Sequence, residues 1–408
     1  MSGGALAVQE SQWARSLDAV KARLGALLGR IEPRRAVWAF LDGLLSGVER
    51  KTGWQLAERA GDAGPWRIQA VLGRGHWDAK AARDLVRSYV IENLGAKDGV
   101  LVIDETGFVK KGEHSVGVAR QYSGTAGRIE NCQIGVFLGY ASGRGHALID
   151  RRLYLPETWA ADAARRRKAH IPDDVAFATK PAMARAMIAT ALDAGVPCAW
   201  VLGDTVYGSD KRLRMMLERR HQPYVLAVRS NERLLADDRT LGHARGTASD
   251  LAQALPAPAW MRHSAGWGAK GPRLYDWARV RLLRLQRPPW EHWLLIRRNR
   301  MDATDCAYYV VFAPAATTLA ELARVAGQRW TIEECFQAGK GDVGLDHCEA
   351  RSWHGWHRHI TLAMLALAFL AVQRAEAAPT DPGKPNKMSL VRPVTRLSSR
   401  SRSRRSAS

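Results

Sequence analysis

The sequence predicts an α/β protein with a mixed sheet, and two patterns in the order of its segments favour this fold class. Apolar, strand-like runs such as "CAWVLGD" (198–204) and "YVLAVR" (224–229) alternate with helical stretches after about residue 155. Between residues 100 and 155, several strand-like stretches follow one another with glycine-rich turns, which is typical of antiparallel neighbours. Helices and strands that alternate after such a group indicate a layered α/β domain.

Length and charge limit the kinds of partner that the protein can have. The chain has 408 residues, 46% of them hydrophobic, which is enough to bury a substantial core. Lys and Arg number 61 against 40 acidic residues, so the formal net charge is +21. The C-terminal tail from Pro379 carries eight Lys or Arg and one Asp, which leaves +14 for the rest of the chain. This excess favours a polyanionic partner, of which nucleic acid is the commonest.

Cysteine spacing and hydropathy indicate a cytoplasmic protein without a membrane partner. The five cysteines form no CxxC pair, so neither a zinc finger nor a disulfide framework is expected. The N-terminus lacks the basic start and apolar run of a signal peptide. The longest apolar stretch, "ITLAMLALAFLAV" (360–372), is shorter than the roughly 20 residues that span a bilayer, and we expect a buried core helix there.

Five regions are expected along the chain. Residues 1–95 have helical spacing and include a helix-turn-helix-like pattern at 54–75, where two short helices flank "GDAGP". With the basic charge, this pattern favours DNA binding, although any helical hairpin has a similar one. The other regions are the first part of an α/β core (96–230), a β-rich insertion (231–318), further core helices (319–375) and a basic, low-complexity tail predicted to be disordered (376–408). Within the insertion we expect loops rich in Arg, Gly, Pro and Trp, followed by a strand pair at "HWLLIRRN" (292–299) and "AYYVVFAP" (307–314).

Two predicted strands end in an aspartate, Asp104 and Asp204. Ligand sites in open α/β sheets lie beyond the carboxyl ends of the strands, so these carboxylates are expected to lie a few ångströms apart. They would repel each other unless a cation lay between them, and hard oxygen ligands select Mg²⁺ or Mn²⁺. Side-chain alternation directs the adjacent Glu105 to the opposite side of its strand. The alternative is that each aspartate only caps a loop.

A third acid lies in "QRWTIEECFQAGKG" (328–341), where Arg329, Glu333 and Lys340 are spaced by four and seven residues. On a helix these three positions lie near one face, since eleven residues make about three turns. One face then presents a carboxylate for a metal ion and two cations for phosphate oxygens. The alternative is a surface helix with ordinary charge pairs.

Further basic residues closely follow the two aspartates. Lys110 and Lys111 come after the first, and Lys211 and Arg212 come after the second. These four side chains are candidates for contacts with DNA phosphates. Solvated surface charge is the alternative for all of them.

The three motifs "VIDETGFVKKG", "VLGDTVYG" and "RWTIEECFQAGKG", in this order, resemble those of bacterial insertion-sequence transposases of the DDE type. More narrowly, they resemble the cut-and-paste group with a Y-x2-R-x3-E-x6-K signature, and the similarity runs from about residue 20 to 372. The resemblance implies an RNase H-like (retroviral-integrase-type) core, with Asp104, Asp204 and Glu333 as the metal-binding catalytic triad. Arg329 and Lys340 match the signature's phosphate-binding residues, whereas its Tyr is replaced by Ala326.

The resemblance also implies a reaction and its partners. A transposase of this group binds the terminal inverted repeats of its element, cleaves double-stranded DNA with two Mg²⁺ ions, for which Mn²⁺ can substitute, and joins the 3′-hydroxyls to target DNA. A homodimer on paired ends and a nucleoid-associated location are expected. Two alternatives stay open: a nuclease that cuts without joining, and an inactive or repurposed copy that binds DNA as a repressor.

Overall fold

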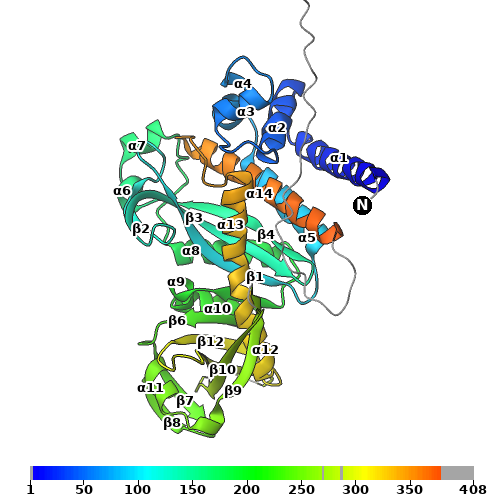
Figure 1. Ribbon diagram of the computed structural model, residues 1–408. Coiled ribbons are helices and arrows are strands. Elements are labelled where there is room, and N and C mark those ends of the chain that lie inside the picture. The colour runs from blue at the N-terminus through cyan, green and yellow to red at the C-terminus, as the bar shows by residue number, and fades with distance from the viewer. Residues whose placement is uncertain (1–2, 269–270, 285–287, 378–408) are drawn as a thin grey trace, which may run out of the picture. The chain divides into compact units, whose positions relative to one another are not determined.

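A ten-stranded mixed sheet runs through the computed structural model, which describes residues 3–268, 271–284 and 288–377 (Figure 1). The strand order is β2-β3-β1-β5-β6-β12-β11-β10-β9, and β4 pairs with β3. The strands of this sheet are β1 (Val100–Val109), β2 (Ala119–Ser123), β3 (Arg128–Ser142), β4 (Gly145–Tyr154), β5 (Trp200–Gly203), β6 (Tyr224–Val228), β9 (Met261–Gly268), β10 (Gly271–Arg281), β11 (Trp290–Arg298) and β12 (Cys306–Pro314). The prediction of an α/β fold with a mixed sheet is confirmed.

Strand β1 lies between one antiparallel and one parallel neighbour. Its first four residues are fully buried, as their β-branched and apolar side chains predict. Parallel pairing with β5 ends at Ile103↔Gly203, whereas antiparallel pairing with β3 continues to Val109↔Cys132. The expectation that the strand stops at the acids is therefore wrong: β1 continues past them because β3 still supplies hydrogen-bond partners.

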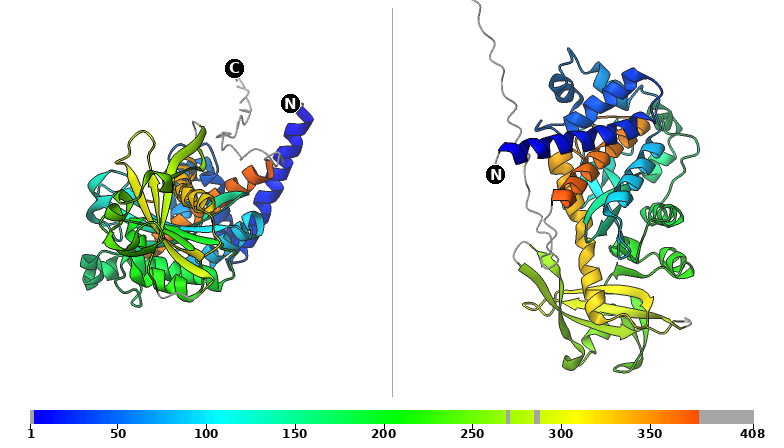
Figure 2. Two further views of the ribbon diagram at one scale, coloured as in Figure 1. Left: turned by 90° about the horizontal axis from the view of Figure 1, so that it is seen from below. Right: turned by 90° about the vertical axis from the view of Figure 1, so that its right-hand side faces the viewer.

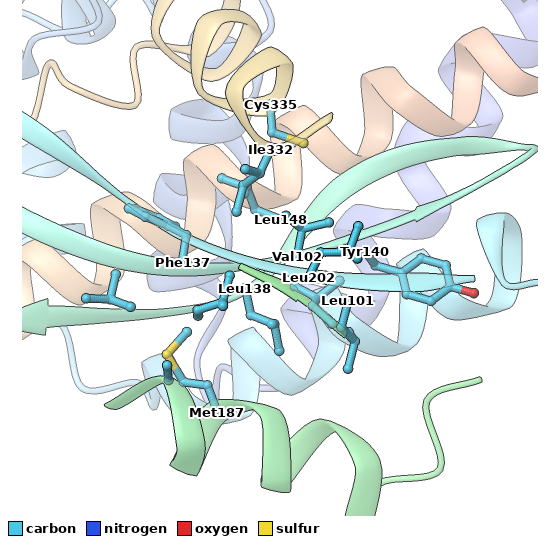
Figure 3. Close-up of a cluster of buried hydrophobic side chains, with 14 of the residues drawn as sticks. Leu101, Val102, Phe137, Leu138, Tyr140, Leu148, Met187, Leu202, Ile332 and Cys335 are labelled. Carbon is cyan, nitrogen blue, oxygen red and sulfur yellow. The ribbon is translucent and has the colours of Figure 1, made fainter. Parts of the chain in front are cut away.

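Helices cover both faces of this part of the sheet. Figure 3 shows Met187 of α8 (Lys180–Asp193) below the strands, and Ile332 and Cys335 of α13 (Thr331–Val343) above them. Helix α8 begins where the Thr179 side chain accepts a hydrogen bond from the Ala182 N–H. Helix α13 ends at Gly344, whose φ of +63° is a left-handed conformation that glycine adopts without strain.

The N-terminal part of the chain is helical and packs against the last described helix, α14 (Trp353–Ala377). Helices α5 and α14 run side by side, and α14 also contacts β4 (Figure 2). The two short helices α3 and α4 correspond to the helix-turn-helix-like pattern, with Pro65 just before the first residue of α4. The N-terminal helices are α1 (Gly3–Gly25), α2 (Ile31–Leu44), α3 (Gly53–Arg59), α4 (Trp66–Leu72) and α5 (Ala79–Leu94).

Helix α14 contains the longest apolar stretch of the sequence. The helix has 25 residues and is therefore longer than its 13-residue apolar stretch suggested. By length and composition alone, it could cross a membrane. Most of its apolar window is buried inside the protein, where it contacts β4, α5 and α13. These contacts are those of a core helix. The predicted basic tail lies outside the described residues, apart from residues 376 and 377 at the end of α14.

The region expected as an insertion contains more strands than predicted. The pair β11–β12 forms as expected, but residues 231–290, expected mainly as loops, contain β9, β10 and a separate hairpin of β7 (Arg233–Asp238) and β8 (Gly242–Thr247). Their Gly and Arg content conceals half-buried strands: Trp277 and Val280 of β10 are fully buried, while Arg281 is exposed. Because β12 pairs with β6, β9–β12 extend the main sheet instead of forming a separate one.

The remaining helices connect the strands. A short helix directly after β5 and the two segments before α13 position residues of the candidate site discussed below. These helices are α6 (Glu157–Ala160), α7 (Ala163–Lys168), α9 (Thr205–Gly208), α10 (Lys211–Arg219), α11 (Ala248–Gln253) and α12 (Leu319–Gly327), with 3₁₀ turns η1 (Ala257–Ala259) and η2 (Gln328–Trp330).

Candidate active site

Asp104 and Asp204 lie on neighbouring parallel strands, each one residue beyond the last paired residues Ile103 and Gly203. Adjacent strands are about 4.8 Å apart, so the register alone places the two residues side by side. Asp204 also begins α9, where its Oδ1 accepts hydrogen bonds from the N–H groups of Val206 (2.9 Å) and Tyr207 (3.4 Å). The expected alternative of a capping role therefore describes part of what Asp204 does.

The two aspartates raise each other's energy in the ionised state. Burial raises the pKa of Asp104 to about 7, and the negative charge of Asp204 adds to this rise. A hydrogen bond of 2.7 Å from the Glu105 N–H and the charge of Arg329 oppose it. The pKa of Asp204 is also raised, by burial first and by the charge of Glu105 second. Such a site holds two negative charges more readily when a cation is present.

Glu333 joins this cluster through Arg329. The guanidinium lies 3.0 Å from Glu333 Oε1 and 3.6 Å from Asp104 Oδ2, so it bridges an acid of α13 and an acid of β1. Arg329 itself belongs to η2, not to α13, so the single helix expected over this stretch is interrupted just before the third acid. In the described part of the chain, no group of three or more His, Cys, Asp or Glu is close enough to hold a metal ion as the side chains lie.

The neighbouring acids of Asp104 and Glu333 have other partners. Glu105 accepts a hydrogen bond from the Tyr207 hydroxyl and forms an ion pair of 2.7 Å with Lys180, the first residue of α8. Both carboxylate oxygens of Glu105 are thus occupied on the α8 side of the sheet. Glu334 lies 3.7 Å from His146, and burial raises its pKa.

Lys340 and Lys110 contact backbone and hydroxyl groups. The Lys340 ammonium donates to the hydroxyl oxygens of Thr106 (2.8 Å) and Thr125 (2.9 Å), and burial lowers its pKa. Lys340 therefore connects α13 to a part of β1 that lies beyond Asp104. The expectation that Arg329, Glu333 and Lys340 lie together on one helix face holds only for Arg329 and Glu333. Lys110 donates to the Cys348 carbonyl at 2.5 Å.

The other predicted phosphate-binding residues lie at the surface. Lys111 follows the end of β1, and Lys211 and Arg212 begin α10; all three side chains are exposed. Ala326, which stands at the signature's Tyr position, is buried in α12. Position 326 of α12 therefore offers no tyrosine hydroxyl to a DNA phosphate.

Lys180 and Tyr207, the two partners of Glu105, were not predicted from the sequence to belong to the site. Tyr207 lies three residues after Asp204 in "GDTVYG", so its position in the motif was a usable local signal. Lys180 is 75 residues from Glu105 in sequence, and no local pattern connects the two. Their contact depends on how α8 packs against the sheet.

The fold is a mixed α/β sheet with acids gathered beyond its parallel strands, which is consistent with a DDE nuclease. The chain belongs to the DDE superfamily endonucleases, whose family model matches residues 23–281. The matched region includes Asp104 and Asp204 and ends before Glu333. The resemblance inferred from the three motifs is confirmed at the level of the family.

The chain is also similar to a named relative, a probable transposase for insertion sequence element IS701 from Microchaete diplosiphon. The two sequences are 29% identical over 191 residues. The match covers 46% of this chain and 47% of the relative, so it spans about half the length of the relative. Members of the DDE superfamily generally use divalent metal ions, and transposases act on DNA.

Proposed function

We propose that this protein is a DNA transposase that cleaves the ends of its insertion sequence and joins their 3′-hydroxyls to target DNA. The observation that carries the proposal is the cluster of Asp104 and Asp204 on adjacent parallel strands, with Glu333 connected to it through Arg329. Family membership and the similarity to a probable transposase support the same reading. An RNase H-like core and DNA binding by the N-terminal helices α1–α5 are part of the proposal.

The residues of the cluster fit divalent metal ions. Three carboxylates offer hard oxygen ligands, and burial together with neighbouring negative charge raises the pKa of Asp104 and Asp204, so a bound cation would favour their ionised forms. Asp104, Asp204 and Glu333 would hold two Mg²⁺ ions, for which Mn²⁺ can substitute. When bound, such ions make a water or a DNA hydroxyl more acidic and stabilise the charge on the leaving oxygen.

The protein's own residues orient the DNA for this reaction. Arg329 stands at the cluster and is the residue best placed to bind the phosphate under attack, since a guanidinium binds phosphate oxygens in pairs. For the carboxylates to act as ligands, this guanidinium moves from between Asp104 and Glu333 onto the DNA. Lys340 holds the β1 segment after the acids, and the exposed Lys111, Lys211 and Arg212 attract the DNA backbone.

The proposed reaction has two steps, and in each one the bonds formed account for the bonds broken. Water first hydrolyses a phosphodiester at the end of the element, which leaves a free 3′-hydroxyl. This hydroxyl then attacks a phosphodiester of the target, so one phosphodiester forms for each one broken and no external energy source is required. Two copies of the protein on paired ends would make the two joints together.

The test is cleavage of labelled double-stranded DNA that carries the sequences flanking the gene, with Mg²⁺ or Mn²⁺. Asp104→Asn, Asp204→Asn and Glu333→Gln are expected to bind this DNA as the wild type does and to lose cleavage by at least a hundredfold. Glu334→Gln is the matched control, because it changes the neighbouring acid of α13 that lies beside His146 instead of Arg329. It is expected to cut normally.

Other outcomes separate the alternatives. Cleavage without joined products identifies a nuclease that does not transfer strands. Binding of the end sequences without cleavage under either metal refutes an active transposase and identifies a repressor-like protein. Loss of cleavage in Glu334→Gln but not in Glu333→Gln refutes the assignment of the third acid.

A further inference from the structure

A pocket of about 540 Å³ opens between the start of α8 and the start of α10. Its wall combines three cationic side chains, two hydroxyls, one aspartate, one phenylalanine and two alanines. The lining residues are Phe177, Ala178, Thr179, Ala182, Arg185, Ser209, Asp210, Lys211 and Arg212. We propose that this pocket binds one nucleotide of an unpaired DNA strand, with its phosphate on Lys211 and Arg212 and its base on Phe177. The inference rests on the proposed function, because it specifies the form of DNA that the protein holds beside its acids.

The charge of the pocket comes from Lys211 and Arg212. Arg185 is neutralised by Asp210, whose two carboxylate oxygens lie 3.0 and 2.9 Å from the same guanidinium nitrogen. Lys211 and Arg212 are exposed, and neither belongs to an ion pair within the described residues. The helix ends are already capped, since Asp210 accepts from the Leu213 N–H at 2.6 Å and Thr179 accepts from the Ala182 N–H at 3.3 Å. An anion in this pocket therefore meets two free side-chain cations.

The size and the aromatic wall favour a nucleotide over a lone phosphate. A volume of about 540 Å³ lies within the range of roughly 300–1,000 Å³ for small-molecule sites, and a phosphate group fills only a small part of it. Phe177 is 40% exposed, and its ring is held edge-on against Tyr154 with the centroids 6.5 Å apart. An exposed ring is a stacking surface for a base, and the faces of bases inside a duplex are covered by their neighbours, so a base that stacks on Phe177 has left the duplex.

Both walls of the pocket adjoin the chain segments that carry the two aspartates. Lys180, between the lining residues Thr179 and Ala182, forms the ion pair with Glu105, which directly follows Asp104. On the other wall, Ser209 follows α9, the short helix that begins at Asp204. A strand with one nucleotide in the pocket is thereby held to the segments that carry the two aspartates.

The test measures binding by fluorescence anisotropy, without divalent metal so that no DNA is cut. The probes are a fluorescein-labelled single-stranded 12-mer and the duplex of the same sequence. Lys211→Gln with Arg212→Gln is expected to weaken single-strand binding at least tenfold, and duplex binding by a clearly smaller factor, because both side chains also attract a duplex backbone. Loss of the contact with this one phosphate lowers the salt dependence of single-strand binding by about 0.7 in log–log slope. The matched control is Lys168→Gln with Arg219→Gln, which removes the same charge from exposed positions on α7 and α10 outside the pocket.

Phe177 supplies the second arm of the test. Phe177→Ala is expected to weaken single-strand binding about tenfold, in keeping with the roughly 1–3 kcal/mol per stacked base, and Phe177→Trp restores it. An equal loss for single strand and duplex, or a loss no larger than in the control, overturns the proposal. Competition by free deoxyadenosine monophosphate as strong as that by the unlabelled 12-mer also overturns it, in favour of a site for free nucleotides.

Failure of this inference is distinguishable from failure of the proposed function. If the wild type cleaves its end sequences and the pocket variants still bind the single strand normally, only the nucleotide pocket is refuted. If the wild type neither binds nor cleaves DNA, the transposase proposal itself fails.

Discussion

Replacing Asp104 by asparagine is expected to stabilise the metal-free protein at neutral and alkaline pH. Burial and the charge of Asp204 raise the pKa of Asp104 from 3.8 to about 7. A carboxyl whose pKa is higher in the folded than in the unfolded protein favours folding below its unfolded pKa, and this advantage is lost as the pH rises through the folded pKa. At pH 8 the full difference of about 3 pK units corresponds to about 4 kcal/mol of strain in the wild type.

Asparagine removes this strain and still offers an oxygen to the Glu105 N–H, and the attraction of Arg329, 3.6 Å away, is already included in the raised pKa of Asp104. We therefore expect a net gain of about 2–4 kcal/mol in the free energy of unfolding at pH 8. Unfolding entropy is about 2.1 cal/mol/K per residue, or about 0.9 kcal/mol/K for a chain of this size, so Tm rises by about 2–5 °C. The gain shrinks steadily as the pH falls towards 4.

Thermal unfolding followed by circular dichroism between pH 4 and 8, in EDTA, measures this gain. Asp302→Asn is the control, since Asp302 is exposed, and the hydroxyl of Thr304 lowers its pKa. It is expected to give no stabilisation at pH 8. An Asp104→Asn variant with the wild-type Tm at pH 8, or with a larger gain at pH 5 than at pH 8, would refute the electrostatic reading of the site. Added Mg²⁺ is expected to raise the Tm of the wild type more than that of the variant.

Three further predictions concern the cations of the site. Arg329→Gln removes the positive charge between the acids, so calorimetry without DNA is expected to show several-fold tighter Mn²⁺ binding; weaker binding would contradict the bridging role. Lys180→Met leaves Glu105 without its ion-pair partner and is expected to lower the free energy of unfolding by about 1–3 kcal/mol, less in a Glu105→Gln background. Lys340→Met is expected to cost about 1–2 kcal/mol and to speed amide exchange around Thr106; unchanged exchange there would show that the lysine does not anchor β1.

Local patterns predicted the parts of the fold that depend on neighbouring residues. Apolar, β-branched runs marked β1 and β5, and the acids at their ends were identified as one cluster because parallel strands share an edge. The hairpin and strands between residues 231 and 290 were missed, because Trp277 and its buried neighbours alternate with charged residues in a Gly- and Arg-rich stretch. Their place in the main sheet depends on the pairing of β12 with β6, and no local pattern specifies that pairing.

The candidate site was predictable to the extent that its residues occupy recognisable motifs. Spacing placed Arg329 four residues before Glu333, and the structure has this contact at 3.0 Å. Spacing also suggested that Lys340 joins them, but about two helical turns separate it from Glu333, and it contacts Thr106 of β1 instead. Lys180 reaches Glu105 from a helix 75 residues away, so only the tertiary packing of α8 reveals it.

The two adjacent acids of β1 have different environments because the strand has two covered faces. Glu105, on the α8 side, has both oxygens occupied by Lys180 and Tyr207, so its charge is balanced within the protein. Among the described residues, Asp104, on the α13 side, has only the shared Arg329 within ion-pair distance. Glu105, whose partners Lys180 and Tyr207 bind no other acid of the site, connects β1 to α8 and α9. Asp104 shares Arg329 with Glu333, and we propose that it is the acid that binds a ligand. If Arg329 leaves Asp104 for a phosphate, as proposed above, DNA binding and metal binding are expected to favour each other at this site.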